Sequence, residues 1–312
     1  MGKYIAKRLG QALVVLFTVM VFLMMHMLPG DPIQIYLGET ATPEQIAHYT
    51  KEFGFDKPLY VQYLKWITGL LHGEMGTSVT YKADVSTLLA KRIITTLSIT
   101  VPAFLLSILI GVTLGVLAGT HRGKKLDSII SIFANIGIAT PAFWIAMILV
   151  WLFALKLKWL PVQGYTPLSE DFALGIKKLV MPVLVLSLGH ITGLTRQTRS
   201  AMLEVVSQDY IRTARSKGLR EKVVVYRHAL RNALIPIVTL LGMSIGGLIG
   251  GTVIIENLFV VPGVGSLMMT AIINKDYMVV QNVVLVISFF VLTCNLLVDI
   301  LYGYIDPRIR LE

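Results

Sequence analysis

One string in this sequence matches a catalytic motif: residues 242–246 read G-x-S-x-G. In hydrolases with this motif the serine sits on a strained turn between a strand and a helix. Ser244 instead lies in a long apolar stretch that predicts a continuous helix, where serine is a small residue that can hydrogen-bond to its own backbone. An intramembrane dyad of Ser244 with His190 is the alternative, which labelling of Ser244 by an active-site probe would reveal. We rank hydrolysis as the least favoured function.

Motifs for nucleotide and metal chemistry are missing from the sequence. The string nearest to a G-x-x-x-x-G-K-[ST] phosphate loop runs from Gly119 to Lys125, but it is one residue short and has no hydroxyl after the lysine. There is no H-E-x-x-H string, and the six histidines are scattered. Cys294 is the single cysteine, which excludes an intrachain disulfide. The sequence therefore predicts no catalytic residue, no metal site and no cofactor bound by this chain.

The composition predicts an integral membrane protein. Of 312 residues, 55% are hydrophobic and 15% are charged, where about 25% charged is usual for a soluble domain. The mean hydropathy is +0.72. A bilayer-spanning helix needs about 20 mostly apolar residues, and six stretches qualify: 9–28, 95–119, 129–155, 179–195, 233–255 and 279–302. The expected fold class is an all-α membrane protein with six transmembrane helices, the third of which contains Pro141.

Lysine and arginine counts predict the orientation in the membrane. With the N-terminus in the cytoplasm, the cytoplasmic segments would be 1–8, 120–128, 196–231 and 303–312, which contain 17 basic and 6 acidic residues. The segments on the other side carry 11 of each. The excess positive charge thus falls on one face, and both termini are predicted to be cytoplasmic. The net charge of +10 therefore does not indicate a nucleic-acid partner.

We divide the chain into three parts: a transmembrane helix at 1–28, an extracytoplasmic segment at 29–94 and a five-helix core at 95–312. The core contains the cytoplasmic loop 196–231. The first helix resembles a signal peptide, but its apolar run is too long and no A-x-A-like cleavage site follows. The segment 29–94 mixes polar residues with apolar patches, which predicts short helices on the outer surface.

Two of the predicted spans carry three glycines at i, i+4 and i+8. They are Gly111, Gly115 and Gly119 in the second span and Gly242, Gly246 and Gly250 in the fifth. This spacing places each set on one helix face, where two backbones can approach closely. Packing within one subunit is the preferred interpretation. A sliding surface at a subunit interface or along a translocation path is the alternative.

Several polar residues fall inside the predicted spans, where they could line a path or hydrogen-bond between helices. They are Asn135, Thr140, His190, Thr192, Asn295 and Asp299. Hydrogen bonding between helices is the preferred interpretation of each alone, and for Asp299 it is an interfacial position near the cytoplasm. Asn135, Thr140 and His190 are also candidates for the path. The spans show no series of carboxylates suited to a proton-coupled pump, which argues against a self-contained secondary transporter.

The loop 196–231 is too long for a simple helix connection. It reads D-Y-I-R-T-A-R-S-K-G-L at 209–219 and V-V-V-Y-R-H-A-L-R-N-A-L-I-P at 223–236. This pattern predicts two short helices with a turn at Gly218, where glycine can adopt a left-handed backbone. An amphipathic segment lying on anionic lipid is the alternative.

These strings resemble the cytoplasmic EAA-type loop of ABC importer permeases, and more narrowly that of the dipeptide/oligopeptide/nickel subfamily. Further strings extend the resemblance over nearly the whole chain: M-L-P-G-D-P at 27–32, F-G-x-D-x-P-L-Y-x-Q-Y at 53–63, E-N-L-F-V-V-P-G-V-G at 256–265, D-Y-x-V-V-Q at 276–281 and D-P-R-I-R at 306–310. The chain resembles the first of the two membrane subunits. Arg212, Thr213 and Ala214 replace the general Glu-Ala-Ala, and Arg231 replaces a proline, as is usual for this subfamily.

The resemblance implies a type I ABC importer-like permease fold with two kinds of functional residue. Residues expected to couple to an ATPase subunit are Asp209, Tyr210, Arg212, Thr213, Ala214, Lys217, Gly218 and Leu219. Residues expected at the outer gate are Glu256, Asn257, Pro262, Gly263 and Gly265.

The resemblance also implies partners and a mechanism. The partners would be a second homologous permease subunit in a heterodimer, two ATPase subunits that bind ATP and Mg²⁺, and an extracytoplasmic substrate-binding protein, all at the cytoplasmic membrane of a bacterium or archaeon. ATP binding would move the coupling helices and switch the permeases from inward-facing to outward-facing. The expected cargo is a di- or oligopeptide. Nickel, a metal chelate and glutathione remain open, because selectivity largely resides in the binding protein.

Overall fold

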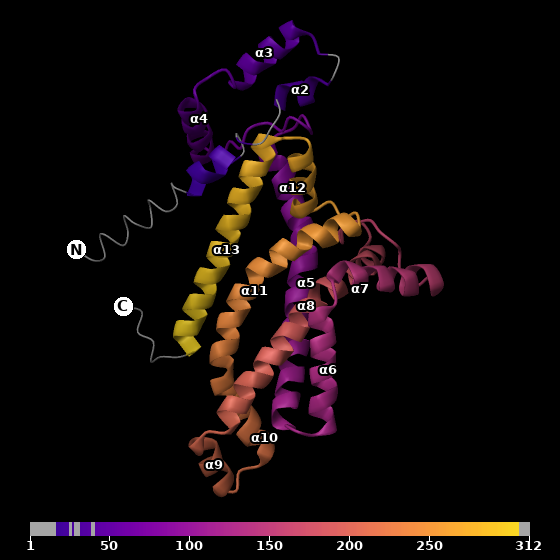
Figure 1. Ribbon diagram of the computed structural model, residues 1–312, viewed down its shortest axis with the longest axis vertical. Coiled ribbons are helices and arrows are strands. Elements are labelled where there is room, and N and C mark those ends of the chain that lie inside the picture. Colours follow the sequence, from indigo (N-terminus) through magenta and orange to yellow (C-terminus); the bar gives the residue numbers. More distant parts are fainter. Residues whose placement is uncertain (1–16, 25–26, 28–31, 39–40, 306–312) are drawn as a thin grey trace, which may run out of the picture. The chain divides into compact units, whose positions relative to one another are not determined.

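The computed structural model describes residues 17–24, 27, 32–38 and 41–305. The chain divides into two compact units. Unit 1 comprises Met1–Ile94 and Ser266–Phe289, and unit 2 comprises Thr95–Gly265 and Phe290–Glu312. Throughout the described ranges the regular structure is helical, apart from one isolated bridge between Thr77 and Asp84 (Figure 1).

Unit 1 is built from short helices and from parts of longer ones. It contains a helix over 17–24, α2 (Pro32–Leu37), α3 (Pro43–Phe53), α4 (Leu59–Leu71), most of α12 (Val264–Ile273) and the first part of α13 (Tyr277–Ile305). A capping box starts α3: the Gln45 amide donates to the Thr42 hydroxyl, and the Thr42 amide donates to the Gln45 side chain. Gly54 ends α3 in a left-handed conformation. The described part of 29–94 contains the short helices α2, α3 and α4 and the start of the long helix α5, and the outer location of this segment stays a prediction.

Unit 2 contains the longer helices that follow. They are α5 (Val85–Thr120), α6 (Lys125–Ala139), α7 (Ala142–Leu149), the π-helix η1 (Val150–Lys156), α8 (Phe172–Val206), α9 (Asp209–Ser216), α10 (Glu221–Val223), the π-helix η2 (Val224–Ala229) and α11 (Leu230–Leu258). Helix α5 begins in unit 1, and the last part of α13 belongs to unit 2. Helix α8 packs against α6, α7 and α11 (Figure 1).

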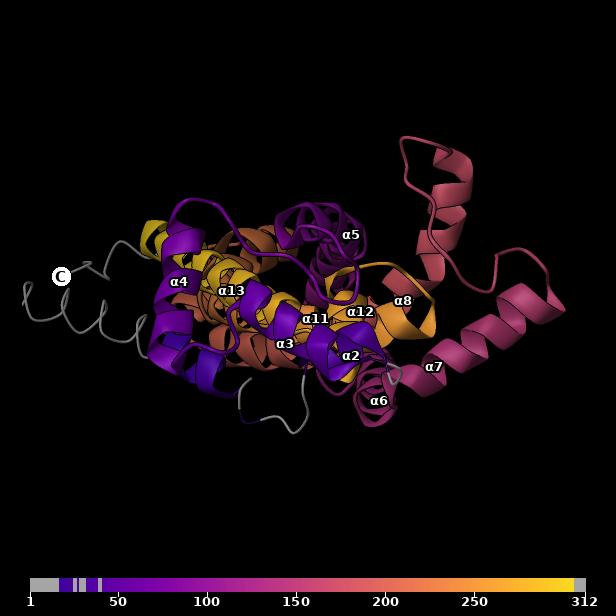
Figure 2. The ribbon, with the colours of Figure 1, turned by 90° about the horizontal axis from the view of Figure 1, so that it is seen from above.

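Four helices in the described part of the chain are long and apolar enough to cross a membrane: Val85–Thr120, Phe172–Val206, Pro236–Leu258 and Tyr277–Val298. The third predicted span is not one straight helix, since Lys125–Ala139 and Ala142–Lys156 form a pair bent by 104°. Figure 2 shows this bend, with α6 viewed nearly end-on and α7 running across the view. The first predicted span lies mostly outside the described residues, so the count of six remains a prediction.

Pro141 explains the bend, because proline has no amide to donate and disfavours a helical conformation at the residue before it. Thr140 has an extended backbone, with ψ at 124°. Its hydroxyl donates to the Ile136 carbonyl at 2.7 Å, which partly satisfies the end of α6. The prediction of a single helix over 129–155 is therefore wrong, although the two helices that replace it are apolar as predicted.

The fourth predicted span, at 179–195, is longer than predicted. Helix α8 runs from Phe172 to Val206, so the beginning of the expected loop 196–231 is helical. Thr195 and Thr198 are buried although they dilute the apolar pattern. The Thr195 hydroxyl donates to the Ile191 carbonyl at 2.7 Å, which removes the cost of burying it.

Two apolar clusters form the core of unit 2. One contains Ile99, Met181, Ile255 and Phe259, with other side chains of α5, α7 and α8 around them. The other joins α8 to α9 and the start of α11. The second cluster gives the predicted coupling loop a fixed place on the rest of unit 2.

Candidate coupling site and Glu256 cluster

Helix α9 is short and strongly amphipathic. Its buried face consists of Ile211, which is 0% exposed, and Ala214. Both belong to the apolar cluster that includes Met202 of α8 and Val224 of η2. Because an isolated eight-residue helix is marginal in water, this packing is what holds α9 as a rigid body.

The turn after α9 depends on Gly218. Its φ of +74° lies in the left-handed region, and its amide donates to the Arg215 carbonyl at 2.9 Å. A Cβ at this position would meet nothing within 4 Å. Glycine is therefore required for its backbone conformation and not for space, which agrees with the predicted turn.

An ion pair closes the same turn. The Arg215 guanidinium donates to both carboxylate oxygens of Glu221, at 3.2 and 2.8 Å. This hydrogen bonding lowers the pKa of Glu221 below its usual value. The second predicted short helix begins at Glu221 and continues through η2 into α11. Any displacement of the turn is therefore passed directly to a long helix.

Seven of the eight predicted coupling residues are exposed, which leaves them free to contact a partner. Ala214 is the exception, because it faces the chain's own core. Ile211 does the same and was absent from the predicted set, although its i, i+3 spacing from Ala214 is a helix-face signal. Tyr210 is hydrogen-bonded to Asn232, and desolvation by burial raises its pKa.

A buried ion pair ties the turn between α5 and α6 to α8. Arg199 donates through Nε and Nη2 to the two carboxylate oxygens of Asp127, at 2.6 and 2.9 Å. The Gly123 amide donates to the same carboxylate at 3.0 Å. Asp127 is 5% exposed. We call this contact the Asp127 brace; sequence reasoning missed it, since nothing local pairs residues 72 positions apart.

The string at 256–265 folds around one carboxylate. Glu256 is 0% exposed and accepts a 2.6 Å hydrogen bond from the Thr96 hydroxyl. The Thr96 oxygen in turn accepts from the Val264 amide at 2.8 Å. A Cβ on Gly263 would collide with the Glu256 carboxylate, and one on Gly265 would lie 2.6 Å from Val253 Cα. Both positions require glycine because the backbone of each lies too close to Glu256 or Val253 to leave room for a Cβ. We call Thr96, Glu256, Gly263, Val264 and Gly265 the Glu256 cluster.

The remaining two predicted gate residues lie on the outside of this cluster. Asn257 and Pro262 are exposed, and the Asn257 side chain donates to the Val253 carbonyl at 2.7 Å. The structure thus separates the predicted gate set into a buried carboxylate with its glycines and an exposed pair.

Three carboxylates among the described residues are buried, and all of them lie in segments predicted to be outside the spans. Asp127, Glu256 and Asp276 are all buried. Asp276 caps the start of α13 and accepts hydrogen bonds from the Ser78 hydroxyl and the Thr80 amide, at 2.6 and 2.9 Å. Each of the three carboxylates is hydrogen-bonded near a helix end, which is a structural arrangement and not a proton relay through a span.

The predicted path residues are only partly brought together. His190 lines two cavities, of about 270 and 150 Å³, and Thr140 lines the smaller one. Asn135 is exposed on α6. Thr192 packs against Gly137 and is fully buried. Asn295 is exposed on α13, and the Asp299 side chain lies outside the described set.

Ser244 shows no sign of activation as a nucleophile. It lies within the continuous helix α11, and its hydroxyl donates to the Leu241 carbonyl at 2.8 Å. It shares the 270 Å³ cavity with His190, yet no hydrogen bond joins the two among the residues that the structure describes. Within that part of the chain, no group of three His, Cys, Asp or Glu residues could hold a metal ion.

Membrane-length helices that lead into an amphipathic helix with an exposed polar face define the class of this protein. It is an all-helical integral membrane protein with the type I importer fold. A chain from an inward-facing crystal form of the MetNI methionine ABC transporter has the same fold, with a TM-score of 0.59 and 19% identity over 70% of this chain and 96% of that one.

Comparison with sequence families identifies the family. Residues 111–311 match the family described as binding-protein-dependent transport system inner membrane component, and residues 1–100 match its N-terminal companion family. The chain belongs to this family. It is 41% identical to the probable peptide ABC transporter permease protein y4tP of Sinorhizobium fredii, over 99% of this chain and 100% of that protein. It is 37% identical to the oligopeptide transport system permease protein AppB of Bacillus subtilis, with the same coverage.

Proposed function

We propose that this chain is the membrane subunit of an importer for di- or oligopeptides, driven by ATPase subunits that dock on the exposed face of α9. The observation that carries the proposal is the two-faced nature of α9, which is rigidly packed inside and polar outside. Relatives that cover the whole chain are named as peptide permeases, which supports peptides as the cargo. Nickel, a metal chelate and glutathione are the alternatives.

The chemistry of ATP stays with the ATPase subunits in this mechanism. Coupling requires a contact whose free energy differs between two states of the transporter. The surface offered by α9 is basic, with Arg212 and Lys217 exposed and Asp209 3.8 Å from Arg212. An acidic groove on an ATPase would attract it. Movement of α9 would reach α8 and α11 through the cluster around Ile211 and Val224.

The loop that carries α9 faces the cytoplasm in this proposal, since the charge distribution favours that side. Both termini are then cytoplasmic, the membrane is the cytoplasmic membrane of a bacterium or archaeon, and the Glu256 cluster belongs to the outer gate. The second permease subunit completes a heterodimer, and a separate binding protein delivers the cargo to the outer side.

Gly218→Pro tests the coupling role. Proline cannot adopt φ of +74° and would remove the hydrogen bond to Arg215. In the reconstituted importer, we expect the chain still to insert in the membrane, but ATP hydrolysis to lose its stimulation by substrate and peptide uptake to fall sharply. Gly218→Ala is the matched control, and it should have a smaller effect of about 1 kcal/mol on the turn. Normal coupled transport by Gly218→Pro would refute the role assigned to α9.

The driving force and the cargo are tested with the same preparation. Uptake of a labelled dipeptide into proteoliposomes should require the ATPase subunits and ATP. Uptake that continues without the ATPase would support a secondary transporter and contradict the proposal. Competition by unlabelled peptide but not by nickel or glutathione would establish the cargo class.

A further inference from the structure

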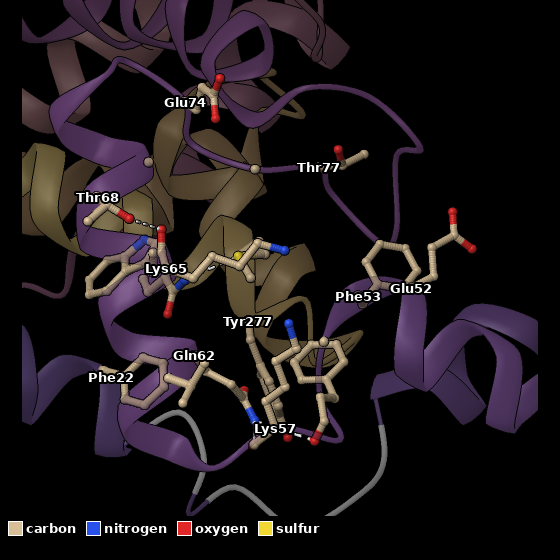
Figure 3. A pocket seen from close by; sticks show the side chains of 18 of the residues that line it. Phe22, Glu52, Phe53, Lys57, Gln62, Lys65, Thr68, Glu74, Thr77 and Tyr277 are labelled. Atoms are coloured by element: carbon tan, nitrogen blue, oxygen red, sulfur yellow. Dashed lines mark hydrogen bonds between the residues drawn. The ribbon is translucent and has the colours of Figure 1, made fainter.

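Unit 1 contains a cavity of about 540 Å³ that belongs to neither the coupling site nor the Glu256 cluster. It is lined by α3, α4, the residues that join them and the start of α13 (Figure 3). Its volume falls in the range of roughly 300–1,000 Å³ that is usual for small-ligand pockets. Part of its wall is the string at 53–63, which the coupling function does not use.

The middle of this pocket is cationic. Figure 3 shows the side chains of Lys57 and Lys65 reaching into the pocket beside Tyr277, with Glu52 and Glu74 placed toward its rim. The ion pairs found among the described residues involve neither lysine. Two ammonium groups without a carboxylate partner favour an anionic group between them.

A buried donor lies in the same wall. Trp66 lines the pocket and is 6% exposed, and its Nε1 has no hydrogen-bond partner among the described residues. A buried N–H without a partner is uncommon, because it loses its hydrogen bond to water and gains nothing in exchange. This atom is itself covered by the surrounding wall, so it marks a locally unsatisfied donor beside the pocket.

Aromatic rings supply the apolar part of the pocket. Phe53 and Phe55 pack against one another, and Phe55 meets Tyr277 edge-to-face with ring centroids 6.3 Å apart. Phe22 stacks on Trp66 at 6.1 Å. These rings provide flat apolar walls for a ligand side chain. The pocket therefore combines cations at its centre, aromatic walls and carboxylates at its rim.

We propose that this pocket binds a short free peptide by its C-terminal carboxylate, which lies between Lys57 and Lys65. This inference rests on the proposed peptide-import function and adds a cargo site on the permease itself. The side chains of the peptide lie against the aromatic walls, and the N-terminal ammonium lies near Glu52 or Glu74. A free peptide carries both terminal charges, whereas a loop of a folded binding protein carries neither. The charge pattern therefore favours the peptide.

The test uses the assembled permease–ATPase complex in nanodiscs, without the binding protein. The tripeptide Ala-Phe-Ala and its C-terminal amide are titrated by equilibrium dialysis. We expect the free acid to bind about tenfold or more tightly than the amide, as for a charge-assisted contact. Lys57→Gln combined with Lys65→Gln should abolish the difference. Lys51→Gln, on α3 but outside the pocket lining, is the matched control and should preserve it.

Equal binding of acid and amide, or no binding of either, would overturn the site. The proposed function is judged separately, by binding-protein-dependent uptake of the same peptide. Uptake without direct binding to the permease leaves the importer assignment intact and removes only the pocket. If the peptide does not bind but the double variant abolishes stimulation of ATP hydrolysis by loaded binding protein, the pocket receives that protein, and the proposal of a free-peptide site is wrong.

Discussion

The glycines of α5 and those of α11 have the same i, i+4, i+8 spacing but different surroundings. A Cβ on Gly111 would lie 3.0 Å from Leu194 Cβ, and one on Gly119 would lie 2.6 Å from Met202 Cβ. The α5 glycines therefore lie in close contact with α8, which agrees with the preferred interpretation of packing within one subunit.

On α11 the contacts become looser along the same face. Gly242 is tightly packed, since its Cβ would lie 2.7 Å from Val298. Gly246 would meet only Val291, at 3.8 Å, and Gly250 would meet nothing within 4 Å. The spacing thus predicts a face for close approach, but it does not predict whether the same chain fills that face. The open end agrees with the alternative interpretation of this set of glycines, a sliding surface at a subunit interface or along a translocation path.

The largest effect is expected for Gly115→Val. The new side chain would overlap Thr198 and lie 2.8 Å from the Thr195 carbonyl, and overpacking of this kind costs about 1–3 kcal/mol or more. We expect little folded protein after membrane insertion, measured by size-exclusion chromatography of the detergent-solubilised chain. Gly250→Val makes the same change at the open position and should elute like wild type. Equal recovery of both variants would contradict the distinction between the tightly packed glycines of α5 and the open Gly250 of α11.

Gly250→Leu tests what covers α11. We expect an unchanged Tm of the isolated chain but a loss of transport of about tenfold, which corresponds to about 1.4 kcal/mol at a subunit contact. Gly250→Ala should show a smaller loss, because a methyl group is easier to accommodate. Full transport by Gly250→Leu would mean that this face contacts lipid and not a partner.

Mutation of the Asp127 brace tests whether glycine packing alone holds α5 and α6 on α8. Asp127→Asn leaves the Arg199 guanidinium half-buried without its counter-charge, and we expect a loss of about 1–3 kcal/mol, measured by thermal unfolding in nanodiscs. Arg199→Gln combined with Asp127→Asn should recover part of this loss. Additive single effects in the double-mutant cycle would show that the two side chains are not coupled.

The smallest effect concerns pH and the turn at Gly218. The pKa of Glu221 is lowered in the folded chain, so its pairing with Arg215 stabilises the turn at neutral pH and is lost as pH falls through the folded-state pKa. The pair is exposed and screened by salt. The difference in Tm between wild type and Glu221→Gln should therefore be small at neutral pH and vanish in acid. A difference that grows in acid would have the wrong sign for this pair.

Local features of the sequence predicted much of the fold. The second, fourth, fifth and sixth predicted spans appear as long helices, because apolar composition over about 20 residues is a local property. The turn at Gly218 and the two-faced helix before it were also predicted, since both depend on residues within a few turns. The bend at Pro141 was not predicted. The effect of a proline on a helix in a membrane protein depends on how neighbouring groups satisfy the freed carbonyls, which is not a local property of the sequence.

What the sequence alone determined is that this chain is an apolar, helical membrane protein with a basic segment at 209–219 that forms a short helix and a turn. What only the tertiary structure decided is which glycines are filled, that Glu256 is buried beneath Gly263 and Gly265, and that Asp127 pairs with Arg199. The reason is that periodicity and composition act within one helix, whereas the Asp127–Arg199 and Thr96–Glu256 contacts join residues 72 and 160 positions apart. Such pairings depend on how whole helices pack, and no single stretch of sequence contains that information.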